Sequence, residues 1–351
     1  MPQRSRALLI GGGGVGTLTG FNFESGGHVT VTFILRSNYD IVRERGFTIT
    51  SCDHGRYDAW RPLGGILPEV PKVEAGPAFG WVICCTKNIP DVGQGLEDMI
   101  RPAVTPGVTT IVLIQNGLGI EKPFLEAFPD NVCLSGVSFC GVQETSPGHI
   151  LHNEPDVSTI SAFINPTMDS EKQHQKAREF VRLYEASGNV KTSFHPDAQA
   201  VRWRKLLTNA VFNPICALTN LDTGRLRLTA MLGGPSIFQG LIMPAMREIQ
   251  DAALSVANVT LTEDYIDSAI EGDSVTSFVM PSMQQDARKG NCIEHEVILG
   301  EACRAAQEHG VAMPVVNTLY HLCRAVQFRT REEKCCINID TLANLYTKSK
   351  E

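Results

Sequence analysis

The chain has 351 residues, which is long for one hydrophobic core and predicts two domains. Hydrophobic residues make up 43% and charged residues 20%, as is ordinary for a globular protein. The formal net charge of −7 excludes a broad electrostatic attraction to nucleic acid or an anionic membrane. No apolar run reaches the roughly 18 residues of a membrane-spanning helix, and no signal-peptide pattern opens the chain, so we expect a cytoplasmic location.

The 11 cysteines are odd in number and scattered along the chain. They include two adjacent pairs, Cys84-Cys85 and Cys335-Cys336, but no C-x-x-C pair of the kind found in zinc sites. Many unpaired cysteines in a long chain fit a reducing compartment. We therefore expect reduced thiols and no metal site.

The first half of the chain alternates short apolar runs with helical stretches, a pattern typical of a parallel sheet covered by helices. The predicted strands cover residues 7–10, 29–35, 81–85, 110–114 and 132–139. Residues 148–152 and 158–164 are expected to form a further, antiparallel pair of strands. Residues 169–187 predict an amphipathic helix. Together these elements predict a doubly wound, Rossmann-like α/β domain over residues 1–195.

Long helical patterns take over after about Pro196, and β-branched clusters become rare. The predicted helices cover residues 198–219, 236–257, 262–271, 293–309 and 315–328. No helix is predicted beyond residue 328. The sequence therefore predicts an all-helical C-terminal domain over residues 196–351.

A glycine-rich loop joins the first predicted strand to a helix expected at residues 15–24. It contains Gly11-x-Gly13-x-x-Gly16, with Gly12, Gly14 and Val15 between the spaced glycines. In a dinucleotide-binding turn, the second glycine allows the pyrophosphate to approach and the third lets the helix pack on the strand. The helix N-terminus then offers free N–H groups to the phosphates. The loop predicts a dinucleotide site, with a plain tight turn as the alternative.

The second predicted strand is followed by Arg36, where an NAD enzyme usually has an acidic residue for the ribose hydroxyls. A guanidinium suits a 2′-phosphate, which predicts NADPH rather than NADH. Lys87 and Asn116 follow two further strands, and in open α/β sheets the ligand lies beyond the carboxyl ends of the strands. Both are expected to contact the cofactor. Their alternatives are an exposed loop lysine and an Asn-Gly turn.

Lys205, Asn209 and Asn213 recur every four residues in a predicted helix whose other residues are largely apolar. This spacing places the three side chains on one helical face, and Pro214 should kink the helix just after them. Buried polar groups need partners, so the face is expected to line a cleft. Burial lowers the pKa of an ammonium group. Such a lysine can protonate the oxygen of a ketone that accepts a hydride.

In this order, these motifs resemble those of the ketopantoate reductase (2-dehydropantoate 2-reductase) family over most of the chain. A later match is the run from Ser282 to Asp286, followed by Glu294. The resemblance implies a Rossmann domain, an all-helical domain and an active site in the cleft between them. It also implies NADPH-dependent reduction of 2-dehydropantoate to pantoate, a step of pantothenate and coenzyme A synthesis. A homodimer formed through the helical domain is a further implication.

The resemblance also implies roles for single residues. Lys205 matches the general acid, and Glu294 matches the acid that contacts the cofactor and helps to hold the lysine. The matched cofactor contacts are Gly11, Gly13, Gly16, Arg36, Lys87 and Asn116, within a loop that also includes Gly12, Gly14 and Val15. The matched substrate contacts, besides Lys205, are Asn209, Asn213 and Ser282. A third substrate asparagine of the family is missing, and Asn220 or Thr223 stands near its place.

Three alternatives stay open on the sequence alone. A relative could reduce another 2-oxo acid or oxidise a D-2-hydroxy acid, because the missing asparagine changes the hydrogen bonds that select the substrate. A non-catalytic NADPH-sensing module would keep the glycine loop and Arg36 but would not need Lys205. A structural protein would need neither set.

Overall fold

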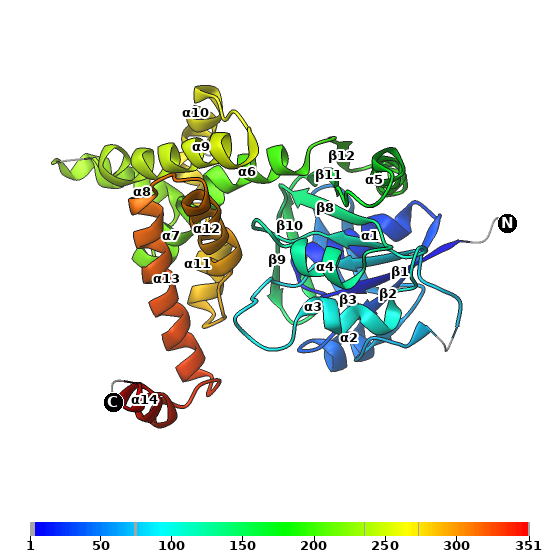
Figure 1. Ribbon diagram of the computed structural model, residues 1–351. Helices are drawn as coiled ribbons and strands as arrows, with labels where there is room; N and C mark the ends of the chain where they lie inside the picture. The colour runs from blue at the N-terminus through cyan, green and yellow to red at the C-terminus, as the bar shows by residue number, and fades with distance from the viewer. Residues whose placement is uncertain (1–3, 74–75, 235, 273, 350–351) are drawn as a thin grey trace. The chain divides into compact units, whose positions relative to one another are not determined.

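The computed structural model describes residues 4–73, 76–234, 236–272 and 274–349 (Figure 1). The chain divides into two compact units, Met1–Val201 and Arg202–Glu351. Across the described ranges, no helix combines the length and the apolar character required to cross a membrane.

The larger sheet of the first unit has eight strands among the described residues, in the order β12-β11-β8-β7-β6-β1-β2-β5. These strands are β1 (Ser5–Ile10), β2 (Val29–Ile34), β5 (Ile66–Leu67), β6 (Trp81–Cys84), β7 (Thr110–Leu113), β8 (Cys133–Ser138), β11 (Val157–Phe163) and β12 (Lys191–Phe194). All neighbouring strands are parallel except β8 and β11. The predicted Rossmann-like domain is therefore confirmed.

A smaller sheet contains four strands of the described chain, in the order β4 (Gly55–Trp60), β3 (Phe47–Ser51), β10 (His149–Glu154), β9 (Gly141–Ser146). The predicted pairing of residues 148–152 with 158–164 is wrong: β10 pairs with β3 and β9, whereas β11 pairs with β8 and β12. Only Pro155-Asp156 connects β10 to β11. A two-residue hairpin favours residues with positive φ, and proline is fixed at negative φ, so the chain crosses from one sheet to the other.

Helix α1 (Gly14–Ser25) packs against strands of both sheets, including β2 and β9. Its Phe23 ring stacks on Phe180 with centroids 4.8 Å apart, and its Phe21 ring meets Trp60 edge-on at 5.3 Å. A helix covered on several sides needs apolar or small residues all round, which explains why α1 has no polar face. The remaining α-helices described in this unit are α2 (Tyr39–Arg45), α3 (Leu96–Ile100), α4 (Lys122–Ala127) and α5 (Ser170–Glu185).

The secondary-structure elements that the structure describes in the second unit are all helices, as predicted. Its α-helices are α6 (Ala198–Asn209), which begins in the first unit, α7 (Phe212–Thr219), α8 (Thr223–Leu228), α9 (Met243–Ala257), α10 (Glu263–Glu271), α11 (Ser282–Arg288), α12 (Glu301–Glu308), α13 (Pro314–Glu333) and α14 (Ile339–Lys348). Two π-helical turns, Phe238–Ile242 and Glu296–Gly300, lead into α9 and α12. Helix α14 lies beyond residue 328, where no helix was expected.

The helix expected at residues 198–219 is broken in two at Ala210-Val211. Ala210 lies four residues before Pro214, whose ring has no N–H to donate to the Ala210 carbonyl and clashes with it. The kink therefore falls inside the predicted polar face rather than after it. Lys205 and Asn209 lie on α6, whereas Asn213 lies on α7, so the spacing no longer places all three on one helical face.

Candidate active site

Four parallel strands of the first unit end at the same edge of the large sheet. Their last residues are in register, with Ile10 beside both Ile34 and Cys84, and Cys84 beside Leu113. The loops that follow carry the glycines, Arg36, Lys87 and Asn116, respectively. The sheet thus brings together the predicted cofactor contacts of the first unit at one edge, which is where open α/β sheets bind ligands.

The spaced glycines meet different surroundings. Gly11 has φ +100°, a conformation that favours glycine, and a Cβ added there would lie 2.9 Å from Thr86. A Cβ on Gly16 would collide with the Gly11 carbonyl oxygen, because α1 packs tightly on the loop. A Cβ on Gly13 would meet nothing within 4 Å, so this residue faces open space. A dinucleotide-binding loop needs a tight turn, close packing of the helix on the loop, and open space for the ligand. Gly11, Gly16 and Gly13 meet these three needs in that order.

Gly13 is also the N-cap of α1, and glycine has no side chain with which to cap a helix. The first turn contains no acidic residue that would repel an anion. Next to it, a Cβ on Gly14 would lie 2.9 Å from the backbone of Gln143 in β9. The helix N-terminus is therefore suited to a phosphate and is fixed in place by the small sheet.

Asn38 is a buried residue at this edge that sequence analysis passed over. Its amide Nδ2 donates to the Gly12 carbonyl at 3.0 Å and to Glu144 Oε1 at 2.9 Å. The Thr17 hydroxyl donates to the same Gly12 carbonyl at 3.1 Å. These bonds fix the conformation of the glycine loop. The contact with Glu144 spans 106 residues of sequence, so no local pattern could have indicated it.

The other loops of the edge differ in exposure. Gln115 Nε2 donates to the Thr86 carbonyl at 2.7 Å, which ties together the loops carrying Asn116 and Lys87. Arg36 and Lys87 are exposed, and Asn116 is half-buried. Arg36 forms no ion pair with any carboxylate of the described residues, so its guanidinium is available to an anionic ligand.

In the second unit, Lys205 and Asn209 are half-buried on α6, beside Leu206 and Leu207, which are buried. Asn213 on α7 is buried, and its Oδ1 accepts a hydrogen bond from the Met283 backbone N–H at 3.2 Å. That bond joins α7 to the first turn of α11, where half-buried Ser282 is the first residue. Asn213 and Ser282 are therefore brought together, and the amide NH₂ of Asn213 remains a donor that this bond does not use.

The two substitutes for the missing asparagine are held within the helical unit. Asn220 caps α7 in a left-handed conformation, and its Oδ1 and carbonyl accept hydrogen bonds from Arg288 at the far end of α11. Thr223 is buried, and its hydroxyl donates to the Val279 carbonyl at 3.3 Å. Both side chains thus have a structural role within the helical unit.

Glu294 is buried and precedes the π-helical turn Glu296–Gly300. Next to it, Glu296 accepts a hydrogen bond from Tyr320 at 2.9 Å and contacts His295 Nε2 at 3.2 Å and Arg304 at 3.0 Å. These partners, the His295 hydrogen bond first, lower the pKa of Glu296 to about 2. A second carboxylate, which sequence analysis did not single out, therefore anchors the segment that carries Glu294.

Gln284 of α11 is another residue that sequence analysis did not weigh. It is fully buried, yet neither its Oε1 nor its Nε2 has a hydrogen-bond partner within the part of the chain that the structure describes. A buried amide without partners is costly. Gln284 lies two residues from Ser282. The helix predicted to contact the substrate therefore contains a buried donor and a buried acceptor that form no hydrogen bond within the described residues.

A parallel sheet with a glycine loop at its carboxyl edge, followed by a helical unit, defines a Rossmann-like α/β protein with a helical C-terminal region. Two family models describe this arrangement: the ketopantoate reductase PanE/ApbA model matches residues 7–165, and its C-terminal counterpart matches residues 197–327. The chain belongs to the ketopantoate reductase family and is an oxidoreductase of that type.

Individual relatives agree with this assignment. An uncharacterised protein of Saccharomyces cerevisiae is 35% identical, with 96% of this chain and 97% of that protein aligned. The 2-dehydropantoate 2-reductase of Halobacterium salinarum is 26% identical over 92% of this chain and 99% of its own.

Two solved structures share the fold. The 2-dehydropantoate 2-reductase of Methylococcus capsulatus has a TM-score of 0.74 and 27% identity over 93% of this chain and 97% of its own. D-mandelate dehydrogenase in complex with NADH and anilino(oxo)acetate has a TM-score of 0.76 over 93% of this chain and 99% of its own. Its identity is 18%, so this likeness concerns the fold alone.

Proposed function

We propose that the protein reduces 2-dehydropantoate to pantoate with NADPH, and so acts in pantothenate and coenzyme A synthesis. The observation that carries the redox part of the proposal is the shared edge of the large sheet. There, the open space above Gly13 and the exposed guanidinium of Arg36 follow neighbouring strands.

The residues of this edge fit NADPH. The pyrophosphate would lie over Gly13, where no side chain intrudes, and would accept hydrogen bonds from the first turn of α1. Arg36 would bind the 2′-phosphate, because its planar guanidinium matches phosphate geometry and it has no carboxylate partner among the described residues. Bound NADPH would supply the hydride that reduces the 2-oxo carbon.

In this proposal, the second unit supplies the proton and the substrate contacts. As the hydride arrives, negative charge develops on the carbonyl oxygen, and the Lys205 ammonium stabilises that charge and donates a proton to it. Hydride and proton together convert the ketone to a hydroxyl group. The Asn213 amide and the Ser282 hydroxyl, which lie at the start of α11, would hold the substrate, with Asn209 beside Lys205. Glu294 would help to hold the lysine.

The second candidate is a reductase of another 2-oxo acid, or a dehydrogenase of a D-2-hydroxy acid, with the same chemistry. The observation in its favour is that the Asn220 and Thr223 side chains are hydrogen-bonded within the helical unit. Asn220 accepts hydrogen bonds from Arg288, and the Thr223 hydroxyl donates to Val279, so both are engaged elsewhere. A site built to pair with a substrate hydroxyl strongly rejects substrates that lack it, and a site without such a group does not.

The test compares substrates and one variant. Purified protein is assayed with NADPH against 2-dehydropantoate and against branched and aromatic 2-oxo acids. A preference for 2-dehydropantoate in kcat/KM is expected, and equal or faster turnover of the other acids favours the second candidate. Lys205→Ala should lower kcat by about 100-fold or more, the scale of a lost general acid.

The same variant separates an enzyme from a sensor. NADPH affinity, measured by fluorescence titration, should remain within about 2-fold in Lys205→Ala. The matched control is Lys289→Ala, an exposed lysine in the same unit, which should keep full turnover. Undiminished turnover in Lys205→Ala would refute the mechanism.

A further inference from the structure

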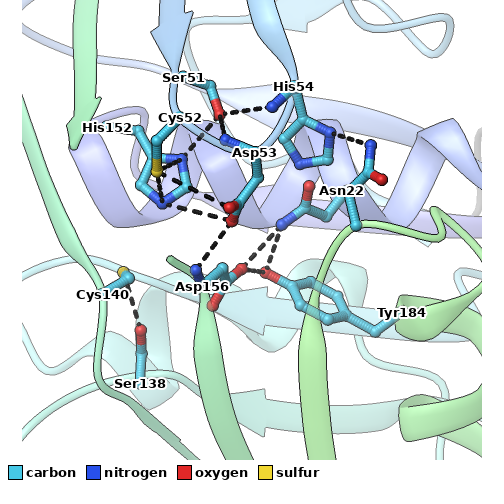
Figure 2. Close-up of polar contacts among 11 residues, drawn as sticks. Asn22, Ser51, Cys52, Asp53, His54, Ser138, Cys140, His152, Asp156 and Tyr184 are labelled. Atoms are coloured by element: carbon cyan, nitrogen blue, oxygen red, sulfur yellow. Dashed lines mark hydrogen bonds and ion pairs between the residues drawn. The ribbon is translucent and has the colours of Figure 1, made fainter. Parts of the chain in front are cut away.

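Three side chains of the types that bind metals lie close together in the first unit (Figure 2). Parallel pairing of β3 with β10 places Ser51 beside His152. Cys52 and Asp53 come from the turn between β3 and β4, and the Cys52 N–H donates to the His152 carbonyl at 2.9 Å. Cys52, Asp53 and His152 each offer one ligand atom, and these three atoms lie within 4.8 Å of one another.

The separations within this group are too long for good hydrogen bonds but suit a shared ion. Cys52 Sγ lies 3.9 Å from each ring nitrogen of His152 and 3.7 Å from Asp53 Oδ1. His152 Nε2 lies 3.8 Å from the other Asp53 oxygen, Oδ2. A tetrahedral zinc ion at about 2.0–2.3 Å from its ligands would separate them by about 3.4–3.6 Å. The two Asp53 distances involve different oxygens, and with a single oxygen the three ligand atoms lie within 4.8 Å, so the side chains would close by up to about 1 Å onto one ion.

The surrounding contacts orient two of the three ligands. His152 is fully buried and has Nδ1 2.8 Å from the Ser51 hydroxyl, so this contact fixes the ring and directs Nε2 toward Asp53. Asp53 Oδ2 accepts the Asp156 backbone N–H at 3.0 Å. Metal-bound histidines and carboxylates typically have such second contacts. Cys52 is exposed, which gives an ion access from solvent.

Two buried polar atoms beside the group have no partner within the described residues. They are the Oδ1 of fully buried Asn22 and the Nε2 of His54, and Figure 2 draws both beside the loop that carries Asp53. Buried polar atoms are nearly always hydrogen-bonded to protein or to ordered water. An ion that keeps a water in its fourth position would bring a hydrogen-bonding group to this region.

The Ser51 hydroxyl supports the group and does not act as a nucleophile in it, because its oxygen accepts the backbone N–H groups of Asp53 and His54.

We propose that Cys52, Asp53 and His152 bind a divalent zinc ion, with a water molecule in the fourth position. One sulfur, one imidazole nitrogen and one carboxylate oxygen are all ligands that zinc accepts, and sulfur disfavours magnesium and calcium. The ion would fasten the β3–β4 turn to β10. It would thereby stabilise the small sheet that packs against α1. The bound thiol would release its proton, so affinity would rise with pH.

Metal binding by the full chain tests the proposal. The parent is the Cys335→Ser/Cys336→Ser variant, which removes an exposed adjacent pair that could bind zinc on its own. After chelation and dialysis, the parent is titrated with zinc chloride and with cobalt(II), and bound metal is measured by mass spectrometry. One zinc per chain and a thiolate-to-cobalt charge-transfer band are expected.

Variants then assign the ligands. In the parent background, Cys52→Ser and Asp53→Asn should each weaken zinc binding by more than about 100-fold, beyond the effect typical of outer contacts. Cys52→Ser should also abolish the cobalt band, because it removes the thiolate. Asp58→Asn, an exposed carboxylate on the same hairpin, should bind zinc like the parent. Circular dichroism of the metal-free proteins should be unchanged. Substoichiometric zinc in the parent, or unchanged binding in Cys52→Ser, overturns the proposal.

Discussion

At the scale of single residues, two glycines of the glycine loop lack a side chain for different reasons. Gly16 is required by the fold, because a Cβ there would collide with the Gly11 carbonyl even when no ligand is bound. Gly13 is not required by the fold, because a Cβ there would meet no protein atom within 4 Å and its φ of −75° suits any residue. Packing within the protein therefore does not require glycine at position 13, and the proposed dinucleotide site supplies a reason for it.

This contrast predicts opposite effects of two alanine substitutions. Gly13→Ala should cost less than about 1 kcal/mol of the free energy of unfolding, the scale of a changed helix N-cap. It should strongly weaken NADPH binding. Gly16→Ala should cost about 1–3 kcal/mol of stability in the ligand-free protein, since an added methyl group has no room. Urea unfolding and NADPH titration of both variants measure this; a stable Gly16→Ala, or tight NADPH binding by Gly13→Ala, would contradict it.

The same scale shows what the sequence can predict of a site. The glycine spacing was visible because its contacts are local, between a strand and the next helix. Asn38 was not, because its partner Glu144 comes from a distant strand. The proposed zinc ligands escape a search for close spacing for the same reason: Cys52 and His152 are 100 residues apart and meet only through the pairing of β3 with β10.

At the scale of elements, the segment from Glu294 to α12 is held by its charged side chains. The π-helical turn Glu296–Gly300 places Glu296 against Tyr320 of α13 and Arg304 of α12. π-helical turns are rare and frequently occur at functional sites. Here the turn follows directly on Glu294, so its anchoring bears on the position of that carboxylate.

The lowered pKa of Glu296 predicts that the protein loses stability as the pH falls into the acidic range. Its pKa falls from 4.5 to about 2 on folding, so its ionised form stabilises the protein above about pH 4.5. That contribution is lost as the pH falls from about 4.5 to 2. Glu296→Gln should cost on the order of 2–3 kcal/mol at pH 7 and much less at pH 2.

Urea unfolding at several pH values between 2 and 7 measures this difference. Glu301→Gln is the matched control, because Glu301 also accepts hydrogen bonds from Arg304. A difference between the protein and Glu296→Gln that does not depend on pH would show that the carboxylate has no lowered pKa.

The elements themselves were predicted unevenly. Continuous apolar runs located β1, β2, β6 and β7, since both faces of these strands are covered. Partner strands were not predictable from local pattern, because they come from distant parts of the sequence: β10 pairs with β3, and β11 pairs with β8. Pro214 was recognised as a helix breaker, but its effect appears four residues earlier, at the carbonyl that it cannot bond.

At the scale of the whole molecule, the proposal assigns different tasks to the two units. The first would bind the cofactor through one edge of its sheet, and the second would bind and protonate the substrate through α6, α7 and α11. The domains predicted from sequence, residues 1–195 and 196–351, follow the same division. Mutations of the cofactor contacts in the first unit should then change NADPH binding, whereas mutation of Lys205 in the second unit should change kcat.

Arg36→Ala tests this division. It should weaken NADPH binding by about 1.5–3 kcal/mol, the range for hydrogen bonds to charged groups, while NADH binding stays unchanged. With saturating NADPH, kcat should remain within about 2-fold of the parent, unlike in Lys205→Ala. Arg45→Ala, an exposed arginine at the end of α2, is the matched control. Equal losses for NADPH and NADH would remove the basis for a preference for NADPH.

The contacts between the glycine loop and the small sheet also set the order in which the protein can mature during synthesis. The loop lies within the first 16 residues, yet Gly14 packs on Gln143, and Asn38 links the Gly12 carbonyl to Glu144. The strand that carries Gln143 and Glu144 pairs with β10, which ends at Glu154. Although it is translated first, the glycine loop can reach its final shape only after the ribosome has released the chain to about residue 154. Such distant contacts form late in folding.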